Sequence, residues 1–174
     1  SIYIKERNEV IVIWLAGSLY GHFDVNGFWR IHCKIRFDDE VDPRPDIIDL
    51  VIDSGAEISI LSPDDAEKLG KGYDTLPTNN QRSIGNSGKC NSRILIGASF
   101  VFECPGEDRE IIETLSELRV PDPNSWARPY SLLGLDILNK YRIIVDYRDK
   151  KVILKLKKPI SRPLIAKIDF HKNW

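Results

Sequence analysis

Asp53-Ser54-Gly55 places a carboxylate, a hydroxyl and a glycine directly after the apolar run "IIDLVI". A carboxylate held at the end of a buried strand can act as a general acid or base, and two carboxyls held close together can share one proton. Asp, Ser and Gly also form ordinary turns between strands. This stretch alone therefore leaves a catalytic loop and a structural turn both open.

Two later segments carry further residues of interest. "SLLGLDIL" (131–138) is an apolar run that is broken by Gly134, and the tip "IGNSG" (84–88) lies between two stretches able to pair. In this order, the three segments resemble the retropepsin-like (retroviral-type) aspartic proteases. "LLGLDIL" followed by "YRIIVDYRDKKVIL" is closest in wording to the cellular DNA-damage-inducible ubiquitin-shuttle type and related bacterial and archaeal proteases.

The resemblance covers roughly residues 28–156. It implies an all-β, retropepsin-like acid protease fold: a single-lobe, β-barrel-like domain with one or two short helices, homodimeric. We expect residues 1–174 to form one such domain, with 1–27 as an N-terminal extension of unknown role. Ser54 replaces the commoner Thr, and Leu135 stands where retroviral enzymes have an arginine.

The resemblance also implies roles for individual residues. Asp53 would be catalytic, alternating between acid and base. The other roles are support of the active-site loop, for Ser54, Gly55, Leu133 and Gly134; the floor of the substrate groove, for Ala56 and Glu57; and a flap over the substrate, for Ile84, Gly85, Asn86, Ser87 and Gly88. Asp136 is interpreted as the N-terminal carboxylate of a helix rather than as a catalytic group.

The chain contains no second Asp-[Ser/Thr]-Gly, so a single chain cannot supply both carboxyls of a proton-sharing pair. Asp53 would then meet its own symmetry mate in a homodimer with one active site on the two-fold axis. The apolar segment "PLIAKIDF" (163–170) is a candidate for the interface and equally for an ordinary edge strand.

The elements that must position these residues are mostly strands. We predict a hairpin of residues 9–17 and 28–37 around a turn at 21–27, strands at 47–53 and 56–62, and a helix that begins at Ser62-Pro63 and ends at Gly70. A glycine-tipped hairpin follows. Residues 109–120 suit either a helix or strands, with strands preferred, and 121–129 form a loop. The end of the chain predicts a strand, Gly134, a short helix through Tyr141, and two strands that meet near Arg148.

Composition limits the partners. The 174 residues carry 25 basic and 26 acidic side chains, which gives no electrostatic reason for nucleic acid or a membrane surface to bind. The apolar run "VIVIWLAG" is far shorter than the roughly 20 residues that cross a bilayer. The three cysteines include no CxxC pair, and the histidines lie far apart in sequence. We therefore expect no metal, no cofactor and a reducing, cytoplasmic location.

The sequence thus predicts an aspartic endopeptidase that acts on an extended peptide or protein substrate. The main alternative is a peptide-binding or dimerisation module with the same fold and little or no activity. An unrelated β-rich binding domain and carboxylate-metal chemistry are the remaining alternatives.

Overall fold

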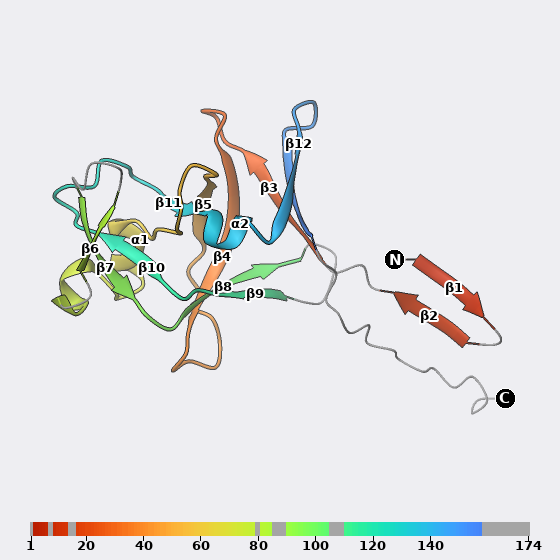
Figure 1. Ribbon diagram of the computed structural model, residues 1–174, viewed down its shortest axis with the longest axis horizontal. Helices are drawn as coiled ribbons and strands as arrows, with labels where there is room; N and C mark the ends of the chain where they lie inside the picture. The colour runs from red at the N-terminus through yellow and green to blue at the C-terminus, as the bar shows by residue number, and fades with distance from the viewer. Residues whose placement is uncertain are drawn as a thin grey trace.

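A computed structural model describes residues 2–6, 9–13, 17–78, 81–84, 90–104 and 110–157 (Figure 1). Strands dominate this part of the chain. They are β1 (Ile2–Glu6), β2 (Glu9–Ile13), β3 (Ser18–Phe23), β4 (Trp29–Phe37), β5 (Ile48–Ile52), β6 (Gln81–Ile84), β7 (Cys90–Leu95), β8 (Ala98–Glu103), β9 (Glu110–Thr114), β10 (Leu118–Pro121), β11 (Ser131–Leu133), β12 (Tyr141–Asp146) and β13 (Lys151–Leu156). The helices are α1 (Pro63–Lys68), the 3₁₀ helix η1 (Tyr73–Thr75) and α2 (Leu135–Leu138).

The largest sheet in the described part of the chain runs in the order β11-β5-β4-β3-β13-β12. Its pairs are antiparallel except β11 with β5, which is parallel. The long strand β4 changes partner along its length, because Arg30–Cys33 pair with β5 and Lys34–Phe37 pair with β8. β8 in turn pairs with β9. One strand thus connects the β5 region to a second set of strands.

A smaller sheet has the order β10-β7-β6, and β1 pairs with β2 as a separate hairpin. Figure 1 shows β6, β7 and β10 gathered with α1 at one end of the fold. The buried core extends through both larger sheets. Its fully buried large side chains include Ile35, Leu50, Phe100, Leu118 and Leu133.

Helix α1 begins and ends as the sequence predicts. The Ser62 hydroxyl accepts the N–H of Asp65 at 3.3 Å, and Pro63 occupies the first turn, where its missing N–H costs nothing. Gly70 follows the helix with a φ of 67°, a left-handed conformation that glycine adopts without strain. The Ser131 hydroxyl donates to Asp65 Oδ2 at 2.7 Å, which fastens α1 to β11.

One predicted pairing and one predicted strand are wrong. Residues 9–13 form a strand, β2, but it pairs with β1, and the hairpin partner of β4 is β3. β3 includes Gly21–Phe23 of the predicted turn, which shortens to Asp24–Phe28, where Asp24 Oδ1 accepts the N–H groups of Asn26 and Phe28. Residues 56–62 form no strand; Ile60 alone makes isolated bridges, to Leu132 and Arg119.

Other predictions are confirmed. Within the predicted segment 109–120, the described residues form strands β9 and β10, which Leu115–Glu117 separate. β11, α2, β12 and β13 follow in the predicted order, but α2 ends at Leu138 rather than at Tyr141. The tip Gly85–Gly88 and the segment 163–170 lie outside the described residues.

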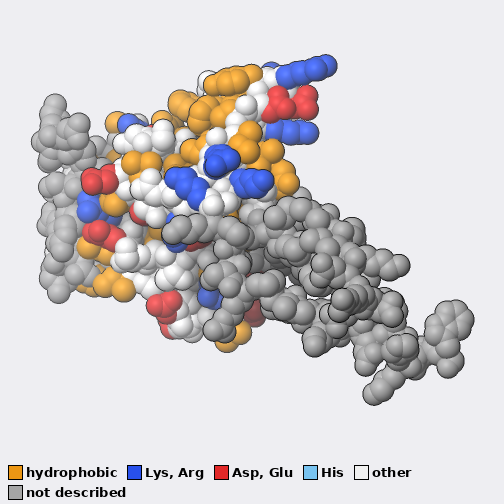
Figure 2. All heavy atoms as spheres, turned by 45° about the vertical axis from the view of Figure 1, so that its right-hand side comes forward, with side chains coloured by type: hydrophobic (Ala, Val, Ile, Leu, Met, Phe, Trp, Pro, Cys, Tyr) orange, Lys and Arg blue, Asp and Glu red, His pale blue; other side chains and the backbone are white. Residues whose placement is uncertain are grey.

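On the face drawn in Figure 2, Lys and Arg side chains form separate patches among hydrophobic and uncharged ones. No helix in the described ranges combines the length and the apolar character that crossing a bilayer requires.

Candidate active site

Asp53 immediately follows β5, and its backbone is fixed by the parallel neighbour β11. Leu133 pairs with Ile52 in register, and the Asp53 N–H donates to the Leu133 carbonyl at 3.1 Å. Because β5 is buried in the sheet, the first residue beyond it is placed with little backbone freedom. The carboxylate therefore stands at a defined point at the end of a buried strand.

The loop after Asp53 folds back on its own carboxylate. The Gly55 N–H donates to Asp53 Oδ1 at 2.9 Å, the Ala56 N–H donates to the Asp53 carbonyl at 3.1 Å, and the Leu135 N–H donates to the Ala56 carbonyl at 2.8 Å. The Asp53 side chain is 27% exposed. Ser54, Gly55 and Glu57 are exposed, so the tip of the loop faces outward.

At Gly55, the space beside the Asp53 carboxylate favours glycine, whereas the backbone conformation does not require it. Gly55 is not among the described glycines with positive φ, which are Gly27, Gly70 and Gly97. A Cβ added to Gly55 would instead lie 3.1 Å from Asp53 Oδ1. Its small size keeps room beside the carboxylate, and the turn itself does not demand glycine.

Gly134 allows two backbone segments to touch behind the loop. A Cβ at this position would lie 2.4 Å from the carbonyl carbon of Ile58 and 2.8 Å from the Ser59 nitrogen, distances that real Cβ atoms do not show. Neither neighbour is a flexible side chain. The close approach of residues 58–59 to the start of α2 therefore requires glycine.

Hydrogen bonds of Asp136 also hold Ser59 against the start of α2. Its Oδ1 accepts the Ser59 hydroxyl at 2.7 Å, and its Oδ2 accepts the Ser59 N–H at 3.0 Å. The Ser59 hydroxyl in turn accepts the Gly134 N–H at 3.0 Å, and Ser59 is fully buried. Asp136 also accepts the Ile137 N–H, so it does stand in the first turn of a helix, as expected.

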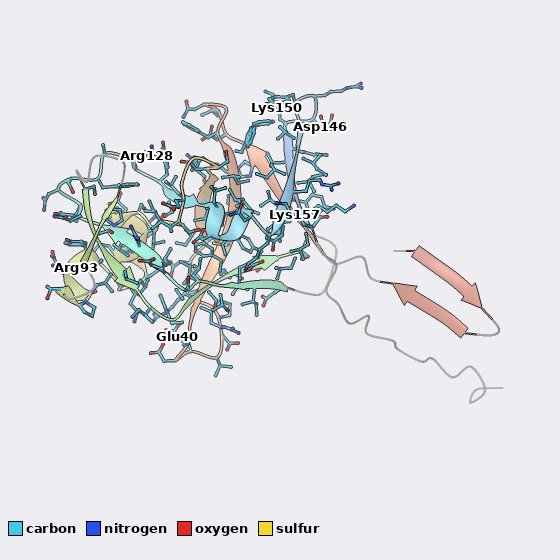
Figure 3. All side chains as sticks on the ribbon, viewed as in Figure 1. Glu40, Arg93, Arg128, Asp146, Lys150 and Lys157 are labelled. Atoms are coloured by element: carbon cyan, nitrogen blue, oxygen red, sulfur yellow. The ribbon has the colours of Figure 1, made fainter. Side chains whose placement is uncertain are left out.

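An arginine that the sequence did not single out lies against the carboxylate. Arg128 Nη1 stands 3.2 Å from Asp53 Oδ2, and the two side chains are 50% and 27% exposed. Arg128 comes from the segment between β10 and β11, where Figure 3 labels it. The sequence predicts only a loop for this segment. Arg128 and Asp53 are 75 residues apart in the sequence, and no local pattern identifies such a pair.

The wall beside the loop is apolar. Val51, Ile60 and Leu132 form a small buried cluster. Ala56, Trp126 and Tyr130 pack against this cluster, and Ala56 belongs to the loop that follows Asp53. The same 122–130 segment thus supplies both apolar side chains and the guanidinium that faces Asp53.

The predicted site residues are only partly brought together. Asp53, Ser54, Gly55, Ala56, Leu133 and Gly134 meet at the ends of β5 and β11. Ile84 ends β6 and pairs with Cys90 of β7, as one arm of the predicted flap hairpin. Gly85, Asn86, Ser87 and Gly88 lie outside the described residues, and their role stays a prediction.

Two histidines that are ten residues apart in sequence lie side by side in the fold. The rings of His22 and His32 have centroids 5.0 Å apart, and both side chains lie near Asp49. These residues belong to β3, β4 and the body of β5, so they are separate from the loop at Asp53.

No protein family model matches this sequence, and no curated protein matches it. Among solved structures, the chain is similar to the crystal structure of a retropepsin-like aspartic protease from Rickettsia conorii, with a TM-score of 0.54 and 21% sequence identity. The fold is retropepsin-like. The similarity covers 80% of this chain and 99% of the Rickettsia chain, so it extends well beyond the loop at Asp53.

Proposed function

We propose that this chain is an aspartic endopeptidase whose catalytic pair consists of two Asp53 carboxyls, one from each protomer of a homodimer. The observation that carries the proposal is the position of Asp53. It projects, half-buried, from the end of a strand whose backbone is held by β11. The retropepsin-like fold supports the same function.

The described chain offers one such loop, and the reaction needs two carboxyls. In the proposed mechanism one ionised Asp53 takes a proton from a water molecule, while the protonated Asp53 of the second copy donates a hydrogen bond to the scissile carbonyl. The water oxygen adds to the carbonyl carbon, and the amine leaves with a proton from the pair. Carboxyls about 3 Å apart do not both ionise readily, so the pair shares one proton.

The exposed tip of the loop supports assembly. Ser54 points outward, and no hydrogen bond of its hydroxyl occurs within the described ranges. We assign it a bond across the two-fold axis, which would hold the two loops rigid. Gly55 leaves space beside the carboxylate, and Ala56 and Glu57 would form the floor of the groove.

The Arg128 side chain has to move away when the two Asp53 carboxyls meet, because its guanidinium lies beside Asp53 Oδ2. Ion pairs between side chains this exposed contribute at most about 1 kcal/mol. A dimer interface of ordinary size can offset such a cost. Arg128 is therefore compatible with the proposed pair, provided that its side chain turns toward solvent or substrate.

An extended peptide or protein is the proposed substrate. Ile84 and the residues Gly85–Gly88 would close over it and exclude water, and the apolar wall near Ala56 favours apolar side chains in the groove. The amino-acid sequence of residues 132–154 supports the cellular, DNA-damage-inducible branch of the retropepsin-like proteases rather than the retroviral branch. The buried thiols of Cys33 and Cys90 support action in a reducing, cytoplasmic setting.

The experiment that tests this function compares Asp53→Asn with Asp46→Asn in the purified full chain. A library of fluorogenic peptides would report cleavage, and sedimentation would report assembly. Asp53→Asn should abolish cleavage, by at least about 10³-fold, because an amide neither activates water nor carries a proton. Asp46 is exposed in the loop before β5, so Asp46→Asn should keep full activity.

The main alternative is a peptide-binding or dimerisation module with the same fold and little activity. It predicts peptide binding by both variants and no cleavage by the parent chain under any pH. Cleavage that survives Asp53→Asn, or activity that scales with a stable monomer, would contradict the proposed endopeptidase.

A further inference from the structure

Three potential metal ligands meet on the outer face of three neighbouring strands. His22 lies on β3, His32 on β4 and Asp49 on β5. His32 and Asp49 are direct partners in the antiparallel register of β4 and β5, and His22 is the register partner of Arg30, two residues before His32. Residues two apart on one strand share a face, so the register brings all three side chains to the same surface.

The donor atoms are already close. One ligand atom from each of the three residues lies within 4.8 Å of the others, and His32 Nε2 is 3.4 Å from Asp49 Oδ1. Adjacent ligand atoms of a tetrahedral zinc ion stand about 3.3 Å apart, given metal–ligand distances near 2.0–2.1 Å. The His32–Asp49 separation meets this requirement as it is, and the His22 ligand atom, within 4.8 Å of the other two, would move closer by side-chain rotation.

Asp49 is prepared as a ligand by its neighbours. Arg30 Nη1 binds Asp49 Oδ2 at 2.9 Å, and Arg30 Nε binds Asp24 Oδ2 at 2.6 Å, so the guanidinium is balanced by two carboxylates. Asp49 Oδ1 makes no hydrogen bond in the part of the chain that the structure describes, and it stands 3.4 Å from His32 Nε2. The Asp49 side chain is 41% exposed, so this oxygen is available to an ion that enters from the histidine side.

The histidines also have access to solvent. They line a hollow of about 220 Å³, whose wall includes Tyr20, Ile47 and the Lys34–Glu103 ion pair. Both imidazoles are exposed, and a hollow of this size admits an ion together with water. A fourth ligand position could therefore be filled by water.

We propose that His22, His32 and Asp49 bind one divalent transition-metal ion of the zinc type, at a site separate from the Asp53 loop. Two imidazole nitrogens and one carboxylate oxygen suit Zn²⁺, and they suit Mg²⁺ or Ca²⁺ poorly, since those ions take oxygen ligands. Arg30 orients the carboxylate as an outer partner of the site.

The neighbouring thiol does not take part. Cys33 follows His32, but its side chain belongs to the buried core on the opposite face of β4. Cys33 is only 4% exposed, and successive residues of a strand point to opposite faces, so its thiol does not face an ion on the outer surface. The nitrogen and oxygen ligands remain.

The bound ion would link three strands, β3, β4 and β5. A ligand that binds only the folded chain raises its stability in proportion to the logarithm of ligand concentration over Kd. At about 100-fold excess over Kd, we expect the Tm of the full chain to rise by about 5 °C or more.

Titration calorimetry with ZnCl₂ on the EDTA-treated, dialysed full chain tests the site. We expect one Zn²⁺ per chain, a Kd raised at least about tenfold by His22→Ala, His32→Ala or Asp49→Asn, and binding lost in the double histidine variant. Asp46→Asn is the matched carboxylate control and should leave Kd within about twofold. Both histidines are exposed, so the variants should fold with the Tm of the metal-free parent.

Cobalt substitution gives a second readout. Co²⁺ bound at this site should show visible absorption of a four- or five-coordinate nitrogen and oxygen site without a thiolate charge-transfer band, and this absorption should disappear in the double histidine variant. Zn²⁺ binding that persists in that variant, displacement of Zn²⁺ by millimolar Mg²⁺, or no binding by the parent chain would each overturn the proposal.

Discussion

The tip of the Asp53 loop and the backbone behind it differ sharply in how far one chain completes their interactions. At the tip, Ser54 and Gly55 are exposed, and Asp53 itself is held by one N–H and one exposed arginine. Behind it, Ser59 is fully buried, and both oxygens of Asp136 are used. One chain thus completes the hydrogen bonds behind the loop and leaves the end that carries Asp53 exposed.

This difference has a physical explanation. In the proposed dimer, each Asp53 carboxyl shares a proton with that of the other copy, and it gains nothing from saturating hydrogen bonds within its own chain. Its position, however, must be fixed to a fraction of an ångström, and only the backbone behind it can provide that. We therefore expect substitutions behind the loop to act on folding, and substitutions at the tip to act on assembly and catalysis.

Gly134→Ala should have the largest effect on folding. The added Cβ would meet the backbone of Ile58 and Ser59, which cannot move without displacing the loop. Overpacking against backbone should lower the free energy of unfolding by about 3 kcal/mol or more. Urea denaturation followed by tryptophan fluorescence measures this change.

Gly55→Ala is the matched control for this prediction. Its Cβ would contact only the Asp53 side chain, at 3.1 Å, and Gly55 has no positive φ. We expect the free energy of unfolding to change by less than about 1 kcal/mol. Equal destabilisation by both glycine substitutions would remove the distinction between tip and support.

Asp136→Ala should have the next largest effect. It leaves the buried N–H and hydroxyl of Ser59 without their acceptor, which costs about 2 kcal/mol when the acceptor is charged. Asp136→Asn keeps one acceptor oxygen and should fall between the parent and the alanine variant in the same denaturation experiment.

Asp53, at the tip of the loop, provides the control for Asp136. Asp53→Asn removes a charge at the open tip, and the unfolding free energy should change by less than about 0.5 kcal/mol. If Asp136→Ala also leaves the unfolding free energy unchanged, the hydrogen bonds from Ser59 to Asp136 do not stabilise the backbone behind the loop.

The sequence predicted the elements whose signals are local. The α1 start at Ser62-Pro63, strand β5 and the order β11, α2, β12 and β13 all follow from neighbouring residues. The predicted strand at 56–62 is wrong. Alternating apolar and polar residues also suit an extended segment that lies in no ladder, and in this segment only Ile60 makes β-bridges.

Relations between distant residues were beyond local reasoning. The Asp136 carboxylate was placed at a helix start, but its bonds to Ser59 span 77 residues. His22 and His32 meet because β3, and not residues 9–17, pairs with β4. The wrong strand partner thus hid the histidine cluster, and a correct register would have revealed it.

Ser54→Ala should have the smallest effect on the single chain. The hydroxyl is exposed, and no bond to it occurs in the part of the chain that the structure describes, so the unfolding free energy of dilute protein should change by less than about 0.5 kcal/mol. The dimer should respond differently. If the hydroxyl bonds across the axis, its loss should weaken dimerisation by about 1–3 kcal/mol, whereas Ser54→Thr keeps the hydroxyl and should be tolerated. Sedimentation equilibrium over a range of concentrations separates the two effects. A Ser54→Ala chain that dimerises as tightly as the parent would show that the open tip is completed by other groups, and the contrast between tip and support would then rest on Asp53 alone.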